Sequence, residues 1–156
     1  MNIQKRIAGL KSKRSGEQFE RFFEIRCRQL GISCVRIPDG CRQLGAHKIM
    51  RVKTPFDYIV GLGKSVIFVD LKSTTSNRFT YSQIDQSQLK ALSLLSQHQG
   101  AGYLIYYRTS QELVYYKAGE LSVVERGSGL EDSQGVRLGK IFEANLRGLF
   151  SDKENT

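Results

Sequence analysis

The sequence predicts a mixed α/β domain in which helices flank a mixed central β-sheet. Residues 55–73 have the pattern of two β-strands joined by a tight Gly-Lys turn. Apolar residues at helical spacing predict one helix over 16–30, before this hairpin, and another over 85–98, after it. Two more strand patterns, at 103–107 and 113–117, complete an order of elements that is typical of such a sheet.

The first helix has a clear apolar face, formed by Phe19, Phe23 and Cys27 among others. Ser15 with Gln18 resembles a capping box at its start, and Gly31 suits its end. In the second helix, Leu89, Leu92 and Leu95 share one face. Both helices are therefore expected to pack against the sheet.

The remaining segments are assigned more simply. We expect one globular domain over 1–150, with a basic N-terminal arm or short first helix at 1–14. The other expectations are a strand at 32–37, a long basic connection at 38–54, a loop at 125–139, a final helix at 138–150 and a disordered tail at 151–156.

Composition excludes several classes of protein. No run approaches the ~18 apolar residues of a membrane span, and the amino terminus lacks the apolar core of a signal peptide, so we expect a cytoplasmic protein, of cellular or viral origin. Three cysteines, with no Cys-x-x-Cys pair, argue against a disulfide framework or a zinc site.

Positive charge is concentrated at one end of the chain. Residues 1–53 hold 13 Lys and Arg against 4 Asp and Glu, whereas residues 54–156 hold 11 of each kind. The whole net charge of +9 therefore lies in the first third. Such a basic region is the electrostatic footprint of a nucleic-acid-binding protein, although an anionic lipid surface or a solvated face would also account for it.

The hairpin contains charges that need an explanation. Asp70 and Lys72 lie two residues apart in a run of Val, Ile and Phe, so they point to one face of their strand. A buried charge without a partner costs several kcal/mol. The Asp-x-Lys pattern therefore indicates a mutual ion pair, a metal or a phosphate.

Four short motifs in order carry a resemblance to a known family. They are the Gly16-Glu17-Gln18-Phe19-Glu20-Arg21 stretch, the Asp57-Tyr58-Ile59-Val60-Gly61 stretch, the Asp70-Leu71-Lys72-Ser73-Thr74 stretch, and Ile84 followed by Gln88-Leu89 and later Gly100. The set resembles the PD-(D/E)xK nuclease superfamily and, within it, the archaeal and RecU-like Holliday-junction resolvases. Residues 38–54 have no clear counterpart in that pattern.

The resemblance implies a restriction-endonuclease-like core and a magnesium-dependent active site, in which Mn²⁺ can replace Mg²⁺. The implied catalytic residues are Glu20, Asp57, Asp70, Lys72 and Gln88. Asp57, Asp70, the Leu71 carbonyl and Glu20 would hold the metal, because hard cations prefer oxygen ligands. Lys72 would orient water or neutralise phosphate charge, and Gln88 would position water or a ligand.

Each assignment has a purely structural alternative. Asp70 with Lys72 can form a structural ion pair, and Asp57 can cap a turn after Pro55. Glu20 can be a solvated helix charge, and Gln88 an ordinary polar residue of an amphipathic helix. His98, at a helix end, is expected to be a surface residue. The aromatic residues Phe79, Tyr81, Tyr103, Tyr106 and Tyr107 can stack on bases or pack in the core.

The sequence thus predicts a structure-selective endonuclease that resolves four-way DNA junctions as a homodimer, since two strands must be cut symmetrically. A related nuclease for duplex, flap or single-stranded DNA, and a non-catalytic DNA-binding module, are the alternatives. The expected DNA contacts come from Lys11, Lys13, Arg14, Arg42, Lys48, Arg51, Lys53, Ser73 and Thr74.

Overall fold

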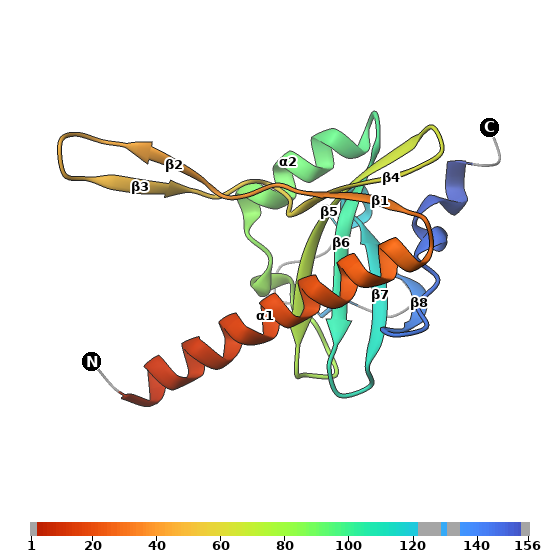
Figure 1. Cartoon of the computed structure of the whole chain (residues 1–156), viewed down its shortest axis with the longest axis horizontal. Helices are drawn as coiled ribbons and strands as arrows, with labels where there is room; N and C mark the ends of the chain where they lie inside the picture. Colours follow the sequence, from red (N-terminus) through yellow and green to blue (C-terminus); the bar gives the residue numbers. More distant parts are fainter. Residues whose placement is uncertain (1–2, 122–128, 131–134, 154–156) are drawn as a thin grey trace.

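A six-stranded mixed sheet forms the centre of the molecule (Figure 1). The computed structural model describes residues 3–121, 129–130 and 135–153. The strand order is β1-β4-β5-β6-β7-β8, in which only β5 and β6 run parallel, and β2 pairs with β3 in a separate hairpin. The elements are α1 (Ile3–Gln29), β1 (Ser33–Arg36), β2 (Gly40–Gln43), β3 (Ile49–Val52), β4 (Tyr58–Leu62), β5 (Ser65–Thr74), η1 (Tyr81–Gln83), α2 (Gln86–Ser96), β6 (Gly100–Tyr107), β7 (Glu112–Lys117), α3 (Ala118–Leu121), β8 (Val136–Lys140) and η3 (Leu146–Lys153).

Helices cover both faces of the sheet. Phe19 and Phe23 of α1 share one hydrophobic cluster with Leu104 of β6. Leu92 of α2 shares a second cluster with Tyr103 and Ile105 of the same strand. Because neighbouring side chains along a strand point to opposite faces, the two clusters lie on opposite sides of β6. This arrangement of layers is the one that the sequence predicts.

The predicted hairpin is present as β4 and β5. Its tight turn contains Gly63, whose φ of 59° lies in the left-handed region that glycine adopts without strain. Leu62 pairs with Ser65 beside the turn and Tyr58 with Val69 at the start of β4, so the two strands stay in register over the whole length of β4. The predicted second helix is also present, and Asp85 caps it by accepting hydrogen bonds from the backbone N–H groups of Ser87 and Gln88.

The first helix is longer than its apolar pattern indicates. The predicted start near residue 16 is wrong, because α1 begins at Ile3 and includes residues 3–14, part of the stretch expected as a basic arm or a short first helix. Lys, Arg, Leu and Ala in this stretch are good helix formers, and a helix can extend beyond the part that packs on the core. Figure 1 shows this N-terminal half projecting away from the sheet.

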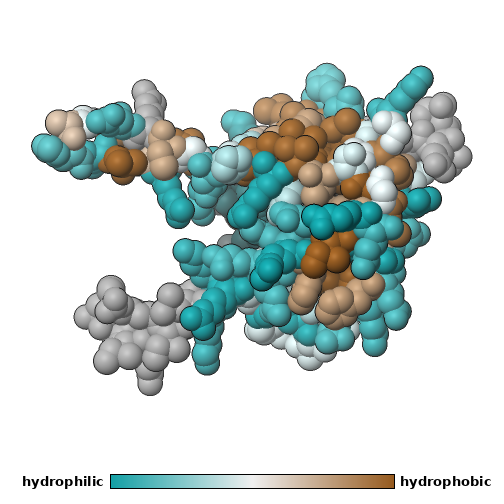
Figure 2. All heavy atoms as spheres, viewed as in Figure 1, coloured by the Kyte–Doolittle hydropathy of each residue, from teal (hydrophilic) through white to brown (hydrophobic). Residues whose placement is uncertain are grey.

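The long connection at 38–54 is a second projection. It forms the β2–β3 hairpin instead of a loop, with Leu44 N–H bonded to the Lys48 carbonyl (2.7 Å) beside the turn at Gly45. Both faces of this hairpin are exposed to solvent, so no alternation of apolar and polar residues marks it in the sequence. Figure 2 shows hydrophobic and hydrophilic side chains side by side along it.

The C-terminal segment also differs from the prediction. The helix expected over 138–150 is instead the end of β8 followed by η3. Leu138, Ile141 and Leu149 are buried as their pattern suggests, but they do not lie in one helix: Leu138 is in β8, Ile141 follows it, and Leu149 is in η3. In the loop predicted at 125–139, residues 136–139 are part of β8, and residues 125–128 and 131–134 lie outside the described residues. In the tail predicted at 151–156, residues 151–153 continue η3, and residues 154–156 lie outside the described residues.

None of the described helices combines the length and the apolar composition that a membrane span requires.

Two glycines provide a contrasting test of this fold. An Ala at Gly102, in the parallel strand β6, would place its Cβ against the Tyr116 carbonyl oxygen and 2.8 Å from the Tyr115 ring. We expect Gly102→Ala to destabilise the protein by about 2 kcal/mol or more, because neither neighbour can move freely. An Ala at Gly16, within α1, meets nothing within 4 Å, so Gly16→Ala should stabilise by roughly 0.5–1 kcal/mol. Urea denaturation of both variants measures the difference, and equal midpoints would contradict the packing of β6 against β7.

Candidate active site

The carboxylates of Asp57 and Asp70 meet where β4 begins and β5 nears its end. Asp57 precedes β4 and extends its ladder, since its N–H donates to the Val69 carbonyl (3.0 Å). Its side chain then folds over β5, where Oδ2 accepts a hydrogen bond from the Leu71 N–H (2.8 Å). Asp70 is only 1% exposed. Both residues line one cavity of about 520 Å³.

Lys72 and Gln88 hold the two oxygens of Asp70. Lys72 Nζ lies 2.5 Å from Oδ2, as expected for residues that share one face of a strand. Gln88 Nε2 donates to Oδ1 (2.6 Å) from the first turn of α2. The N-cap at Asp85 fixes the start of that helix and therefore the position of Gln88.

Burial dominates the electrostatics of Asp70. Loss of solvent raises the pKa of this carboxyl to about 7, although the neighbouring Lys72 ammonium lowers it. Burial raises the pKa of the Tyr103 phenol as well, and the Asp70 charge adds to that effect. Three buried side-chain atoms in the described part of the chain have no hydrogen-bond partner: Asp70 Oδ2, Gln88 Oε1 and the Tyr103 hydroxyl. The contact of Asp70 Oδ2 with Lys72 is an ion pair without hydrogen-bond geometry. Such atoms call for a further polar partner.

Glu20 reaches the same cavity from α1. Its carboxylate is paired with Arg36, at the end of β1 (2.7 Å). Burial raises the pKa of Glu20, and the Arg36 guanidinium partly offsets this. Arg36 is a residue that sequence reasoning missed, because only the pairing of β1 with β4 brings it beside the cavity.

The predicted DNA contacts are spread over four parts of the surface. Lys11, Lys13 and Arg14 belong to α1, and Lys48 and Arg51 are exposed on the projecting β2–β3 hairpin, to whose strand β2 Arg42 also belongs. Lys53 lines the cavity of Asp57 and Asp70. Ser73 and Thr74 line a neighbouring hollow, but Thr74 is 7% exposed and its hydroxyl accepts a hydrogen bond from the Ser76 N–H.

The aromatic residues follow the structural alternative. Phe79, Tyr81, Tyr103 and Tyr107 are buried in the core, and Tyr106 is half-buried against the ring of Phe19 (5.2 Å between centroids). His98 is exposed just after α2. The four buried rings therefore offer no free face for stacking on bases.

Comparison with known proteins identifies the family of this chain. The sequence profile of the family RecU, described as recombination protein U, matches residues 20–133, which include every candidate catalytic residue. The chain belongs to the RecU family. This confirms the resemblance that the four motifs carry. No match was found among curated protein sequences.

The fold of this RecU-family chain is similar to that of Hjc, a Holliday junction resolvase from the archaeal hyperthermophile Archaeoglobus fulgidus. The similarity has a TM-score of 0.55 and covers 78% of this chain and 95% of the other, at 15% sequence identity. It confirms the predicted fold class, a mixed sheet flanked by helices with a restriction-endonuclease-like core.

The donor set of the cavity suits a hard divalent cation. In the described part of the chain, no three side chains of His, Cys, Asp and Glu lie close enough to form a complete metal-binding cluster. The carboxylates of Asp57 and Asp70 meet in this cavity, however, and Asp70 Oδ2 and Gln88 Oε1 are buried oxygens that lack a hydrogen-bond partner. Magnesium typically takes one or two protein carboxylates and completes its shell with water and phosphate oxygens. The residues therefore fit such an ion better than they fit a closed, all-protein metal cage.

Proposed function

We propose that this RecU-family protein is a magnesium-dependent endonuclease that resolves four-way DNA junctions by hydrolysing phosphodiester bonds. The observation that carries the proposal is the meeting of Asp57, Asp70, Lys72 and Gln88 in one cavity, within a chain of this family. Mn²⁺ is expected to replace Mg²⁺, because the same oxygen donors suit both ions.

Asp57 and Asp70 are the proposed metal-holding side chains, together with the Leu71 carbonyl. When bound there, the ion would polarise the scissile phosphate and lower the pKa of an attacking water. Asp57 is already oriented by the Leu71 N–H, and Asp70 by Gln88. Glu20 is paired with Arg36 in this structure, so its share in holding the ion requires that this ion pair opens.

Lys72 and Gln88 act on the reacting groups. Lys72 places its positive charge beside Asp70, where the scissile phosphate gains negative charge as its P–O bond breaks. Gln88 uses Nε2 to hold Asp70, which leaves its buried Oε1 to accept a hydrogen bond from a water. A second copy of the chain is needed to cut the second strand of a junction, so we propose that the active form is a homodimer.

Cleavage of a DNA panel tests the proposal. Purified protein is incubated with a four-way junction, a flap, a linear duplex and single-stranded DNA of the same sequences, at one salt concentration, with Mg²⁺ or with EDTA. We expect cleavage of the junction only with the metal, and much faster than cleavage of the linear duplex. A related nuclease would prefer another member of the panel, and a DNA-binding module would cut none of them.

The raised pKa of Asp70 predicts how metal affinity depends on pH. The carboxyl has a pKa of about 7 in the folded protein, against 3.8 for an ordinary aspartate, so it is mostly protonated below pH 7. A metal binds only the ionised form, and its affinity should therefore increase as the pH is raised through 7. Calorimetric titration with Mn²⁺ at pH 6 and pH 8 checks this: binding at least several-fold tighter at pH 8 is expected, and equal affinity would contradict the role of Asp70 as a ligand.

A further inference from the structure

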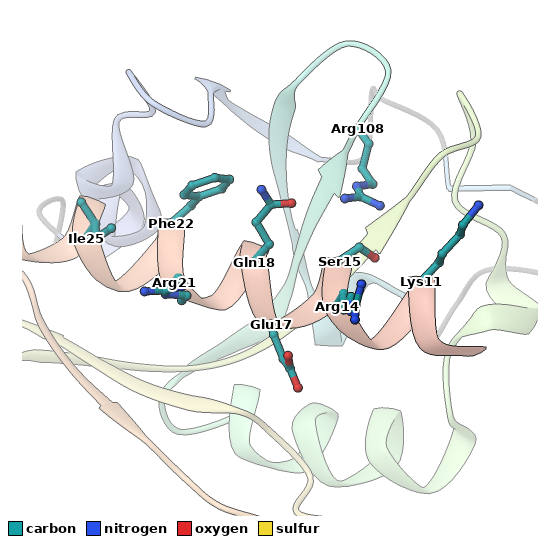
Figure 3. A pocket seen from close by; sticks show the side chains of 9 residues that line it. All are labelled: Lys11, Arg14, Ser15, Glu17, Gln18, Arg21, Phe22, Ile25 and Arg108. Atoms are coloured by element: carbon teal, nitrogen blue, oxygen red, sulfur yellow. The ribbon is translucent and has the colours of Figure 1, made fainter. Parts of the chain in front are cut away.

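The molecule has a second hollow, of about 700 Å³, on the side of α1 that faces away from the active site. Eight residues of α1 and Arg108, just after β6, line it (Figure 3). Consecutive helix residues are turned by about 100°, so Lys11, Gln18 and Phe22 share one face. Glu20 lies about 160° from Gln18 around the same helix. The body of α1 therefore stands between the hollow and the active-site cavity.

The charges of this hollow are strongly unbalanced. Lys11, Arg14, Arg21 and Arg108 line it, against the single carboxylate of Glu17. In Figure 3, Lys11, Gln18 and Phe22 extend toward the side on which Arg108 lies, whereas Glu17 points away. Within residues 3–121, 129–130 and 135–153, no carboxylate forms an ion pair with any of these four cations. The hollow thus presents uncompensated positive charge to solvent, as a site for an anionic ligand does.

The backbone fixes Arg108 beside the end of β5. Its N–H donates to the Thr74 carbonyl (2.9 Å), and the Thr109 hydroxyl donates to the Thr75 carbonyl (2.9 Å). Arg108 is half-buried, and these hydrogen bonds fix the position of its backbone at the rim of the hollow. A planar guanidinium suits phosphate oxygens, to which it donates two hydrogen bonds.

Lining residues that neighbouring hollows have in common connect this hollow to the active site. Lys11, Ser15 and Arg108 also line a smaller hollow together with Ser73 and Gln83. Gln83 in turn lines the cavity of Asp57 and Asp70. A basic path therefore runs from the active site, past the end of β5, to the far side of α1. A path that joins separate hollows suits an extended polyanion better than a single phosphate.

A straight duplex cannot follow this path. An α-helix with its side chains is about 10 Å wide, and the projecting half of α1 would have to pass through a duplex that occupied both sides. A branched DNA avoids the clash, because two of its arms can lie on opposite sides of the helix.

We propose that the hollow lined by Arg21 and Arg108 binds the phosphate backbone of a second junction arm, while the first arm lies in the active site. The projecting half of α1 separates the two arms, and this selects branched DNA over linear DNA. The inference rests on the proposed function and names the surface on which its substrate selectivity depends.

The test compares two double variants, each of which removes two positive charges. Arg21→Gln/Arg108→Gln changes the hollow, and Lys64→Gln/Lys140→Gln changes exposed lysines in the β4–β5 turn and on β8. Dissociation constants for a four-way junction and for a linear duplex are measured in EDTA, so that no cleavage occurs. Circular dichroism checks that each variant is folded.

We expect Arg21→Gln/Arg108→Gln to weaken junction binding about ten-fold or more and duplex binding at most about three-fold. The slope of log affinity against log salt concentration should fall by about two for the junction, because two phosphate contacts are lost. The control variant should lose at most about three-fold on both substrates. Equal losses on junction and duplex, or losses no larger than those of the control, would overturn the inference. Cleavage of the junction by the wild-type protein is measured separately. If the proposed function is wrong, the wild type does not cut, and this result does not depend on the binding measured for Arg21→Gln/Arg108→Gln.

Discussion

Replacing Asp70 by Asn should reduce junction cleavage about a thousand-fold or more while leaving junction binding largely unchanged. The substitution keeps the shape of the side chain and an oxygen that can accept the hydrogen bond from Gln88 Nε2. It removes the negative charge that faces Lys72 and that a metal would require. Because the pKa of Asp70 is already about 7, a neutral side chain is tolerated here, and the melting temperature should stay close to that of the wild type.

Single-turnover rates with saturating Mg²⁺ measure the effect of Asp70→Asn. A suitable control is Glu112→Gln, which also neutralises one carboxylate, in an ion pair with Arg137 (3.2 Å) outside the cavity. The control should cut at the wild-type rate. If Asp70→Asn also cuts at that rate, Asp70 with Lys72 is only a structural ion pair.

The second large effect is expected for Lys72→Ala. Cleavage should fall about a hundred-fold or more, since the positive charge beside the scissile phosphate is lost. Lys72 also lowers the pKa of Asp70, so its removal should raise that pKa above about 7. Metal binding by Lys72→Ala is therefore expected to need a higher pH than metal binding by the wild type.

The pH shift separates a role in the site from a general loss of stability. Lys64→Ala removes an exposed lysine at the β4–β5 turn, at the other end of the same strand β5, and should change neither the rate nor the pH midpoint of Mn²⁺ binding. Lys72→Arg keeps the charge and should hold the midpoint near that of the wild type. If Lys72→Ala lowers the melting temperature but leaves the pH midpoint of Mn²⁺ binding unchanged, Lys72 contributes only to stability.

Much of the site geometry follows from short-range patterns. A tight Gly-Lys turn sets the register of β4 and β5, and strand alternation then puts Asp70 and Lys72 on one face. The helical period of α2, with its cap at Asp85, brings Gln88 to the same place. These patterns are local, so the sequence contains them, whereas the chemical roles of the residues stay predictions.

The features that sequence reasoning missed depend on contacts between distant segments or on the absence of burial. Glu20 and Arg36 meet only because β1 adds to the edge of the sheet beside α1. The β2–β3 hairpin is exposed on both faces, so the usual alternation of burial does not mark it. In the C-terminal segment, apolar residues at helix-like spacing from Leu138 to Phe150 belong to a strand end and a 3-10 helix, and their side chains are buried in the core.

The two projections give the molecule its shape around the site. Figure 1 shows the β2–β3 hairpin and the N-terminal half of α1 leaving the body on the same side, with the active-site end of β5 between them. Lys48 and Arg51 lie on one projection, and Lys11 and Arg14 on the other. DNA that approaches Asp57 and Asp70 would thus pass between basic elements, which suits a branched substrate better than a flat surface would.

The most direct measurement is the mapping of cleavage sites on a four-way junction whose four strands are labelled one at a time. With Mg²⁺, the wild-type protein should cut two opposite strands at symmetric positions, leave the other two intact, and do neither in EDTA. A junction that remains uncut with both Mg²⁺ and Mn²⁺, or a linear duplex cut equally fast, would contradict the assignment of the Asp57, Asp70 and Lys72 cavity to junction resolution.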